Sequence, residues 1–249
     1  MDRAAILAQL APTGVLRAGI NMSNGLLIST RSADGQPDGV SPGMARAIAD
    51  RLGVPLRLVP FPKPDLVADA AGTGQWDICL VGAEPARAAK IRFTAAYAEI
   101  EATYLVPAAS AIRTIADADR PGISIAVNGG TAYGHWLHRS LANATLLRLG
   151  DDDAVDAFRT GQADALAGLK TQLITLAEAH PGTRIVPGRF TAVQQAIGTE
   201  SGHGEGAQFL HDFVETAKST GLVARLVAQY GVVGLAVAPV SDAKLTAAR

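Results

Sequence analysis

Short apolar runs alternate along the chain with longer segments whose apolar residues recur at helical spacing. In the first half the apolar runs are residues 15–20, 56–60 and 78–81. Strand, helix, strand, helix, strand at this spacing is typical of an α/β unit with a mostly parallel sheet. The pattern starts again with an apolar run at 124–127 and continues at 145–149. We therefore predict an α/β fold in two similar parts.

One four-residue phrase occurs in both parts. Gly74–Asp77 and Gly161–Asp164 read Gly-Gln-Trp-Asp and Gly-Gln-Ala-Asp, and each follows a predicted helix and precedes a short apolar run. Glycine suits a helix C-terminus because it takes the left-handed conformation without a Cβ penalty. A short apolar run after it is typical of a buried parallel strand. Two Rossmann-like lobes with a ligand cleft between them are the interpretation that this repeat favours.

Two amphipathic helices, at about 204–219 and 222–230, are predicted to close the chain. We place the first lobe at 1–106 plus 195–249 and the second lobe at 107–194. Two chain crossings would then form a hinge.

Composition narrows the classes of function. The net charge is −1 and the Lys and Arg residues are scattered, which argues against a nucleic-acid or anionic membrane surface as the main partner. With 48% hydrophobic and 18% charged residues the chain is expected to be compact and globular. No apolar run reaches the roughly 18–20 residues that span a bilayer, so we expect no membrane insertion. The single cysteine, Cys79, falls in a predicted buried strand and is expected to be a core residue.

The first ten residues form an amphipathic helical start. They lack a basic region followed by a long apolar core, so they do not form a secretory signal. Two expectations stay open: the protein is cytoplasmic, or a signal was removed or lies outside this sequence.

Several enzyme-like and metal-like motifs are weak. Gly39–Gly43 matches the Gly-x-Ser-x-Gly of hydrolases, but Pro42 has no backbone N–H to offer to an oxyanion hole. Its serine is predicted to cap a helix instead. His135 and His138 have no Glu or Cys at ligand spacing, and the acidic run Asp151–Asp153 favours a helix start. We expect no catalytic residue, no metal and no cofactor.

In order and spacing these phrases resemble the family 3 solute-binding proteins, which have the type II periplasmic-binding fold and serve ABC importers of amino acids. The matching phrases, between about Val15 and Tyr230, are Gly39–Ala45, Gly74–Ile78, Pro85–Arg87, Phe93–Tyr97, Gly130–Thr131, Gly161–Ala165 and Gly221–Val223. The resemblance implies a binding protein that captures a small carboxylate-bearing solute, an amino acid or organic acid, between two lobes. It also implies an ABC permease as partner, a monomer, and a periplasmic location.

The resemblance assigns two residues to the ligand carboxylate. Arg87 stands six residues before Phe93, where the family has the arginine that grips this group, and a guanidinium offers a planar fork that matches it. Thr131, which follows Gly130 at a predicted helix N-terminus, matches the residue that offers its hydroxyl and N–H. The structural alternatives are a surface ion pair for Arg87 and a plain helix cap for Thr131.

The chain departs from the family where an ammonium group would bind. The acid expected after the Gly-x-x-Asp-Ala strand is missing, and Lys170 stands at or beside its place. The Ser/Thr pair before the arginine is replaced by Leu80 and Gly82, with Glu84 close by. If Lys170 faces the ligand, the ligand carries two acidic groups or no cationic one. Glu84, Glu99 or Glu101 could still hold an ammonium group, and Lys170 could equally be a solvated lysine at a helix start.

Polar residues near strand ends complete the set of candidate ligand-binding residues. Asn21, Ser23 and Asn24 follow the first strand, at the edge where ligands of open α/β sheets gather. Gln194 lies near the predicted return crossing. Each of these side chains could instead cap a turn or a strand edge.

Two other functions stay open. A dehydratase-like lyase on the same fold would need a glutamate and a lysine that abstract and return a proton, and Glu84 and Lys170 are the available pair. A soluble sensor would report ligand-driven closure to a protein partner.

Overall fold

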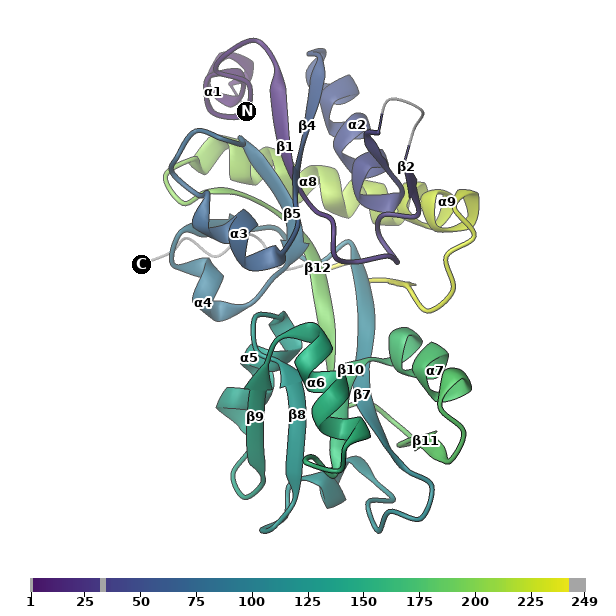
Figure 1. Cartoon of the computed structure of the whole chain (residues 1–249). Coiled ribbons are helices and arrows are strands. Elements are labelled where there is room, and N and C mark those ends of the chain that lie inside the picture. The colour runs from purple at the N-terminus through teal and green to yellow at the C-terminus, as the bar shows by residue number, and fades with distance from the viewer. Residues whose placement is uncertain (1, 32–34, 242–249) are drawn as a thin grey trace. The chain divides into compact units, whose positions relative to one another are not determined.

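The computed structural model describes residues 2–31 and 35–241. The chain divides into two compact units (Figure 1): unit 1 comprises Met1–Glu99 and Gln194–Arg249, and unit 2 comprises Ile100–Val193. The strands β7 (Ala98–Pro107) and β12 (Thr191–Glu200) each begin in one unit and end in the other. The lobe boundaries expected from the sequence stay a prediction.

Unit 1 is built on a sheet with the strand order β4-β1-β5-β12. β1 (Leu16–Asn21) lies parallel to both of its neighbours, β4 (Leu56–Phe61) and β5 (Ile78–Gly82). Parallel neighbours need crossover connections, and α2 (Val40–Leu52) and α3 (Pro64–Asp69) supply them. β12 runs antiparallel to β5. The α/β architecture predicted for the first part is confirmed.

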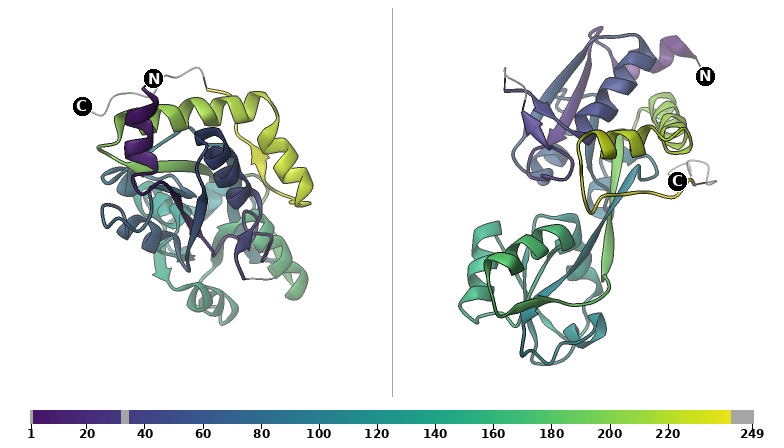
Figure 2. Two further views of the ribbon diagram at one scale, coloured as in Figure 1. Left: turned by 90° about the horizontal axis from the view of Figure 1, so that it is seen from above. Right: turned by 90° about the vertical axis from the view of Figure 1, so that its right-hand side faces the viewer.

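The remaining elements of unit 1 are α1 (Arg3–Leu10), β2 (Thr30–Arg31), β3 (Pro37–Asp38), α4 (Pro85–Ala88), β6 (Ile91–Phe93), α8 (Gly204–Ser219), α9 (Leu222–Gln229) and β13 (Ala236–Val237). α1 packs against α8, and α2 packs against α9 (Figures 1 and 2). The two C-terminal helices therefore complete unit 1. Every helix among the described residues is too short or too polar to cross a membrane.

Unit 2 repeats the same topology. β8 (Ser124–Asn128) lies parallel between β9 (Thr145–Leu149) and β10 (Ala165–Leu169), and β7 runs antiparallel to β10. The crossovers are α5 (Ala132–Ser140) and α6 (Asp151–Arg159). A 3₁₀ helix at Ile115–Ala118, α7 (Lys170–Ala179) and β11 (Thr183–Ile185) complete the unit. By this order α5 and α6 correspond to α2 and α3, and α7, which follows β10, corresponds to α4, which follows β5.

The repeated Gly-Gln-x-Asp phrase has the same structural role in both units. The Asp77 carboxylate accepts a hydrogen bond from Arg17 N at 2.8 Å, and Asp77 N donates to Arg17 O at 2.8 Å. In unit 2 the Asp164 carboxylate accepts from Ser124 N at 2.8 Å, and Asp164 N donates to Ser124 O at 2.9 Å. Each aspartate thus fastens the start of the central strand of its sheet. Gly161 has a φ of 75°, the left-handed conformation expected after a helix.

Each unit has its own apolar core. In unit 1 a buried cluster includes Val67, Trp76, Cys79, Val81 and Ile91. In unit 2 a second cluster includes Ala126, Ala157, Phe158, Leu166 and Leu173. Cys79 is fully buried, as predicted, and burial raises the pKa of its thiol to about 12, so the thiol stays protonated at neutral pH.

The predicted helix cap at Ser41 is wrong. α2 begins two residues earlier than predicted, with Gly39 as its N-cap at a φ of 150°. A Cβ on Gly39 would lie 2.4 Å from Leu27 O, so a neighbouring segment passes where a side chain would stand. Ser41 is buried inside the first turn, and its hydroxyl is hydrogen-bonded to the Tyr97 hydroxyl at 2.8 Å. Local capping rules favoured the serine, but the close approach of this segment needs the glycine.

Candidate functional site

The polar residues after β1 form a tight turn. Asn21 Oδ1 accepts hydrogen bonds from Ser23 N at 3.1 Å and from Ser23 Oγ at 2.9 Å. Asn24 is buried, and its Oδ1 accepts from Leu26 N at 3.1 Å. These contacts are the turn-capping alternative that the sequence left open. A role of the three side chains in ligand binding stays a prediction.

Arg87 is buried, with only 5% of its surface exposed. It follows β5 in the short helix α4, where Nη1 donates to Gly82 O at 2.7 Å and Nη2 forms an ion pair with Asp65 at 2.9 Å. Glu84 Oε1 accepts from Arg87 N at 3.1 Å and so caps α4. The guanidinium plane is therefore held at the carboxyl end of β5. The Asp65 carboxylate, at the start of α3, could not be foreseen as its partner.

Gln194 lies in β12, within unit 1. Its backbone carbonyl accepts from Ala83 N at 2.8 Å, which continues the pairing of β12 with β5. Its side-chain Nε2 donates to Glu99 Oε1 at 3.1 Å. This strand-edge contact ties Gln194 to one of the glutamates considered for an ammonium group.

In unit 2 the turn after β8 is built around Asn128 and Thr131. Asn128 Oδ1 accepts from Gly130 N at 2.9 Å. Thr131 Oγ1 donates to Asn128 O at 2.8 Å and accepts from Gly134 N at 3.0 Å, so Thr131 caps α5. A Cβ on Gly134 would lie 2.2 Å from Asn128 O, and glycine thus allows α5 to start against this turn. The amides of a first helical turn lack intrahelical acceptors and attract anions.

Lys170 begins α7, directly after β10, and is paired with an acid of its own unit. Its Nζ lies 2.8 Å from Glu101 Oε2, and Arg189 Nη1 lies 3.7 Å from the other carboxylate oxygen. The hydrogen bond from Lys170 is the largest influence on Glu101 and lowers the pKa of its carboxyl group. The Lys170 side chain is 39% exposed, and its contact with a ligand stays a prediction.

A pH titration tests the Lys170 pair. A carboxyl group with a lowered pKa in the folded state contributes stability above its ordinary pKa and loses it as the pH falls through the lowered one. We expect a Lys170→Met variant to raise the pKa of Glu101, as followed by carbon NMR of the side-chain carboxyl. Asp119 is an internal control, because backbone amides, first that of Ala142, lower its pKa. An unchanged Glu101 pKa in the variant would show that the pair does not form in solution.

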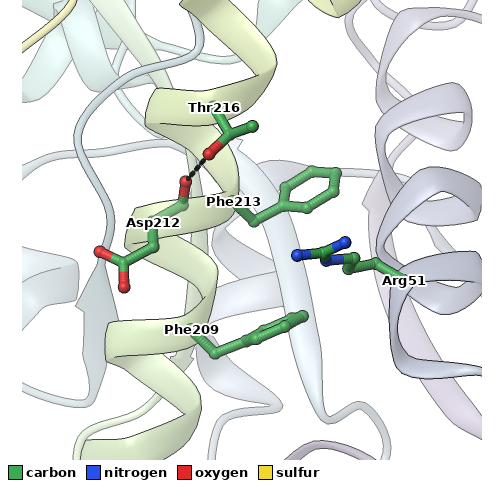
Figure 3. A pocket seen from close by; sticks show the side chains of 5 residues that line it. All are labelled: Arg51, Phe209, Asp212, Phe213 and Thr216. Carbon is green, nitrogen blue, oxygen red and sulfur yellow. Dashed lines mark hydrogen bonds between the residues drawn. The ribbon is translucent and has the colours of Figure 1, made fainter. Parts of the chain in front are cut away.

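Two cavities lie within the units, and the lining of neither includes a predicted binding residue. One of about 230 Å³ lies in unit 1 between α2 and α8 (Figure 3) and is lined by Arg51, Phe209, Asp212, Phe213 and Thr216. Figure 3 shows Arg51 reaching toward the two rings and the Asp212 carboxylate pointing away from it. This lining includes no predicted binding residue.

The other cavity, of about 220 Å³, lies in unit 2 where parallel strands end, and its lining includes Asn128, Tyr133 and Asp151. Burial raises the pKa of the Tyr133 phenol to about 12. From the sequence, Asp151 was interpreted only as a helix-start residue, and it does lie in the first turn of α6. Among the described residues there is no group of three or more His, Cys, Asp or Glu side chains that could hold a metal ion.

Comparison with known proteins decides the family. Residues 17–233 match the bacterial extracellular solute-binding proteins, family 3. The chain belongs to this family. The type II periplasmic-binding fold and the solute-binding function expected of family 3 are thereby confirmed. No curated protein matches the sequence.

Solved structures share the fold of this family 3 protein. One is an ancestral amino acid-binding protein described as a precursor of cyclohexadienyl dehydratase, with 24% identity, a TM-score of 0.70, and coverage of 90% of this chain and 98% of its own. An amino acid ABC transporter substrate-binding protein of Streptococcus pneumoniae, bound to L-arginine, has 19% identity, a TM-score of 0.69, and coverage of 89% and 96%. A binding component of an ABC transporter from Wolinella succinogenes, complexed with lysine, has 20% identity, a TM-score of 0.70, and coverage of 89% and 97%. At these identities the likeness concerns the fold.

Proposed function

We propose that this solute-binding protein captures a small carboxylate-bearing solute, an amino acid or an organic acid. The observation that carries the proposal is Arg87, a buried guanidinium at the carboxyl end of a parallel strand, oriented by Gly82 O and Asp65. A guanidinium oriented in this way can bind a carboxylate through two parallel hydrogen bonds. Similar structures with arginine or lysine bound, both of which carry a carboxylate, support this class of ligand.

The other predicted residues have supporting roles in this proposal. The first turn of α5, after Gly130 and capped by Thr131, offers amide groups and a positive helix end to the carboxylate. The remaining side chains would select among ligands by hydrogen bonds and charge; they are Asn21, Ser23, Asn24, Glu84, Lys170 and Gln194, with the Gly82 carbonyl.

The proposal includes a transport role. We propose that the protein is exported, acts as a monomer and delivers its ligand to the permease of an ABC importer. The family is described as extracellular, and two of the similar structures are components of ABC transporters.

Dehydratase activity is the second candidate, because one similar structure is described as a precursor of cyclohexadienyl dehydratase. Glu84 and Lys170, the available acid–base pair, both have structural partners: Glu84 caps α4 through Arg87 N, and Lys170 is paired with Glu101. We therefore propose binding without turnover.

A thermal-shift screen of the whole chain tests the function. Amino acids, monocarboxylates, dicarboxylates and cyclohexadienyl acids would be added one at a time. A ligand at 100 times its Kd adds about 2.7 kcal/mol to the free energy of unfolding, which corresponds to a shift of several degrees. We expect at least one carboxylate to produce such a shift and to be recovered unchanged, as followed by proton NMR. No shift with any carboxylate would contradict the proposal, and conversion of a bound acid would favour the dehydratase.

A further inference from the structure

The last described segment of the chain lies along the strand that leaves unit 1. We call this segment, residues 231–241, the C-terminal strap; it follows α9 and is drawn in yellow in Figure 1. Its strand β13 pairs antiparallel with β7 and places Ala236 opposite Glu99 and Val237 opposite Ala98. Unit 1 gives way to unit 2 after Glu99. The strap therefore contacts the last two residues of β7 before the chain passes into unit 2.

A buried ion pair on α8 holds the end of the strap. Lys218 Nζ lies 2.8 Å from Glu215 Oε1 and donates a hydrogen bond to Pro239 O at 2.8 Å. Glu215 Oε2 accepts from Ser241 N at 2.8 Å. The Lys218 side chain is 1% exposed and that of Glu215 is 16% exposed. An apolar pair of similar volume often stabilises a core as well or better, so we interpret this ion pair as a device that fixes the position of the strap.

The start of β7 is held by two neighbouring segments. Tyr97, the residue before β7, donates from its backbone N to Gln195 O of β12 at 2.8 Å, and its carbonyl accepts from Ala238 N of the strap at 3.2 Å. Tyr97 is fully buried, and its hydroxyl is hydrogen-bonded to Ser41 of α2. The strap thus adds a second set of backbone contacts to a segment that β12 already holds.

We propose that the C-terminal strap restrains the bending of β7 where the chain leaves unit 1, and that it thereby slows the closure that follows ligand binding. The inference rests on the proposed function, because closure needs a ligand. A hinge consists of a few residues, often at the end of an element, whose φ and ψ angles change. Ala98 and Glu99 begin β7 at the passage between the units, and their pairing with β13 opposes such changes. The ion pair on α8 keeps the strap in this place.

Release of the strap tests the inference. Lys218→Met removes the ammonium group that bonds to Pro239 O and keeps a long apolar side chain in the buried position. Glu215→Gln is a milder second variant, because glutamine keeps an oxygen for Ser241 N but loses the charge that pairs with Lys218. Asp77→Ala is the control for a general loss of stability, because it removes the aspartate that fastens β1 and leaves the strap contacts in place. Circular dichroism checks that each variant of the whole chain folds.

Hydrogen exchange of the ligand-free chain measures the restraint. In Lys218→Met the amides of residues 98–100 should exchange about fivefold faster, the factor that one net hydrogen bond contributes, while the amides of β1 keep their wild-type rates. Glu215→Gln should have a smaller effect in the same direction. Asp77→Ala should not speed the exchange of residues 98–100 more than that of β1.

Ligand kinetics measure the consequence for closure. Stopped-flow fluorescence with a carboxylate identified in the screen gives the association and dissociation rates. We expect both rates to rise about fivefold in Lys218→Met, because release of the strap lowers the barrier to bending in both directions, and to keep their wild-type values in Asp77→Ala. Unchanged exchange at residues 98–100, or unchanged rates, would overturn the inference and leave the proposed function standing. Failure of every carboxylate to bind the wild type would overturn the proposed function and the effect on closure, whereas the exchange experiment reports separately on the strap.

Discussion

An Arg87→Lys variant is expected to lose about a hundredfold in ligand affinity. Lysine keeps the positive charge but lacks the planar fork that binds a carboxylate through two parallel hydrogen bonds. The guanidinium of Arg87 bonds to Gly82 O and Asp65. The single ammonium group of lysine cannot make both of these contacts and also offer two parallel N–H donors to a ligand. A hydrogen bond to a charged group contributes about 1.5–3 kcal/mol, and the upper value corresponds to the loss stated here. Calorimetry with a ligand identified in the screen measures the change.

Arg87→Ala should add a loss of stability. Gly82 O, in a buried residue, would lose the Arg87 donor, and a buried acceptor without a donor costs about 1–3 kcal/mol. The Asp65 side chain is 45% exposed, so water can replace its lost partner. Urea unfolding measures this separately from binding. Arg46→Lys is a matched control in the same unit, because Arg46 is also paired with an acid, Asp38 at 2.8 Å, but is largely exposed. If Arg87→Lys binds ligand as the wild type and Arg46→Lys do, Arg87 has a purely structural role.

The strands and helices could be predicted from the sequence because their signals are local. The apolar runs around Ile78 and Ile125 are short and follow turns, and the amphipathic helices repeat apolar residues at the helical period. The start of α2 was predicted wrongly at Ser41, since the deciding contact joins Gly39 to Leu27, a residue of another segment. A rule that considers only neighbouring residues could not include that contact.

The sequence proposed members of a candidate site but not the partners of their side chains. Arg87 was proposed through the family resemblance, yet its pairing with Asp65 bridges 22 residues and depends on α3 and α4 starting at the same sheet edge. The pairing of Lys170 with Glu101 bridges 69 residues and depends on β7 lying beside β10. The hydrogen bond between Asn128 and Asp151 could not be predicted, because the two residues come together only once β8 and β9 are paired. Contacts of this kind follow from topology, which local patterns do not determine.

An Asp77→Ala variant is expected to lower the free energy of unfolding by about 3 kcal/mol, the low end for breaking a buried ion pair. Asp77 is 3% exposed and accepts hydrogen bonds from Arg17 N at 2.8 Å and Arg17 Nε at 3.0 Å. Alanine would leave both donors without an acceptor, and Arg17 is itself only 20% exposed. Urea unfolding of the intact chain measures the change.

Asp164→Ala is the matched comparison, because the same phrase places Asp164 at the same position of the other sheet. Its carboxylate accepts from the first residue of β8, from Ser124 N and Ser124 Oγ, both at 2.8 Å, as Asp77 accepts from the second residue of β1. Asp164 is exposed, so water can replace the lost acceptor, and we expect a cost of about 1 kcal/mol. A larger loss of unfolding free energy for Asp77→Ala would show that burial and the charged partner determine how much this aspartate stabilises its sheet. Equal losses for the two variants would show that each aspartate stabilises its sheet by fastening the strand, independently of burial.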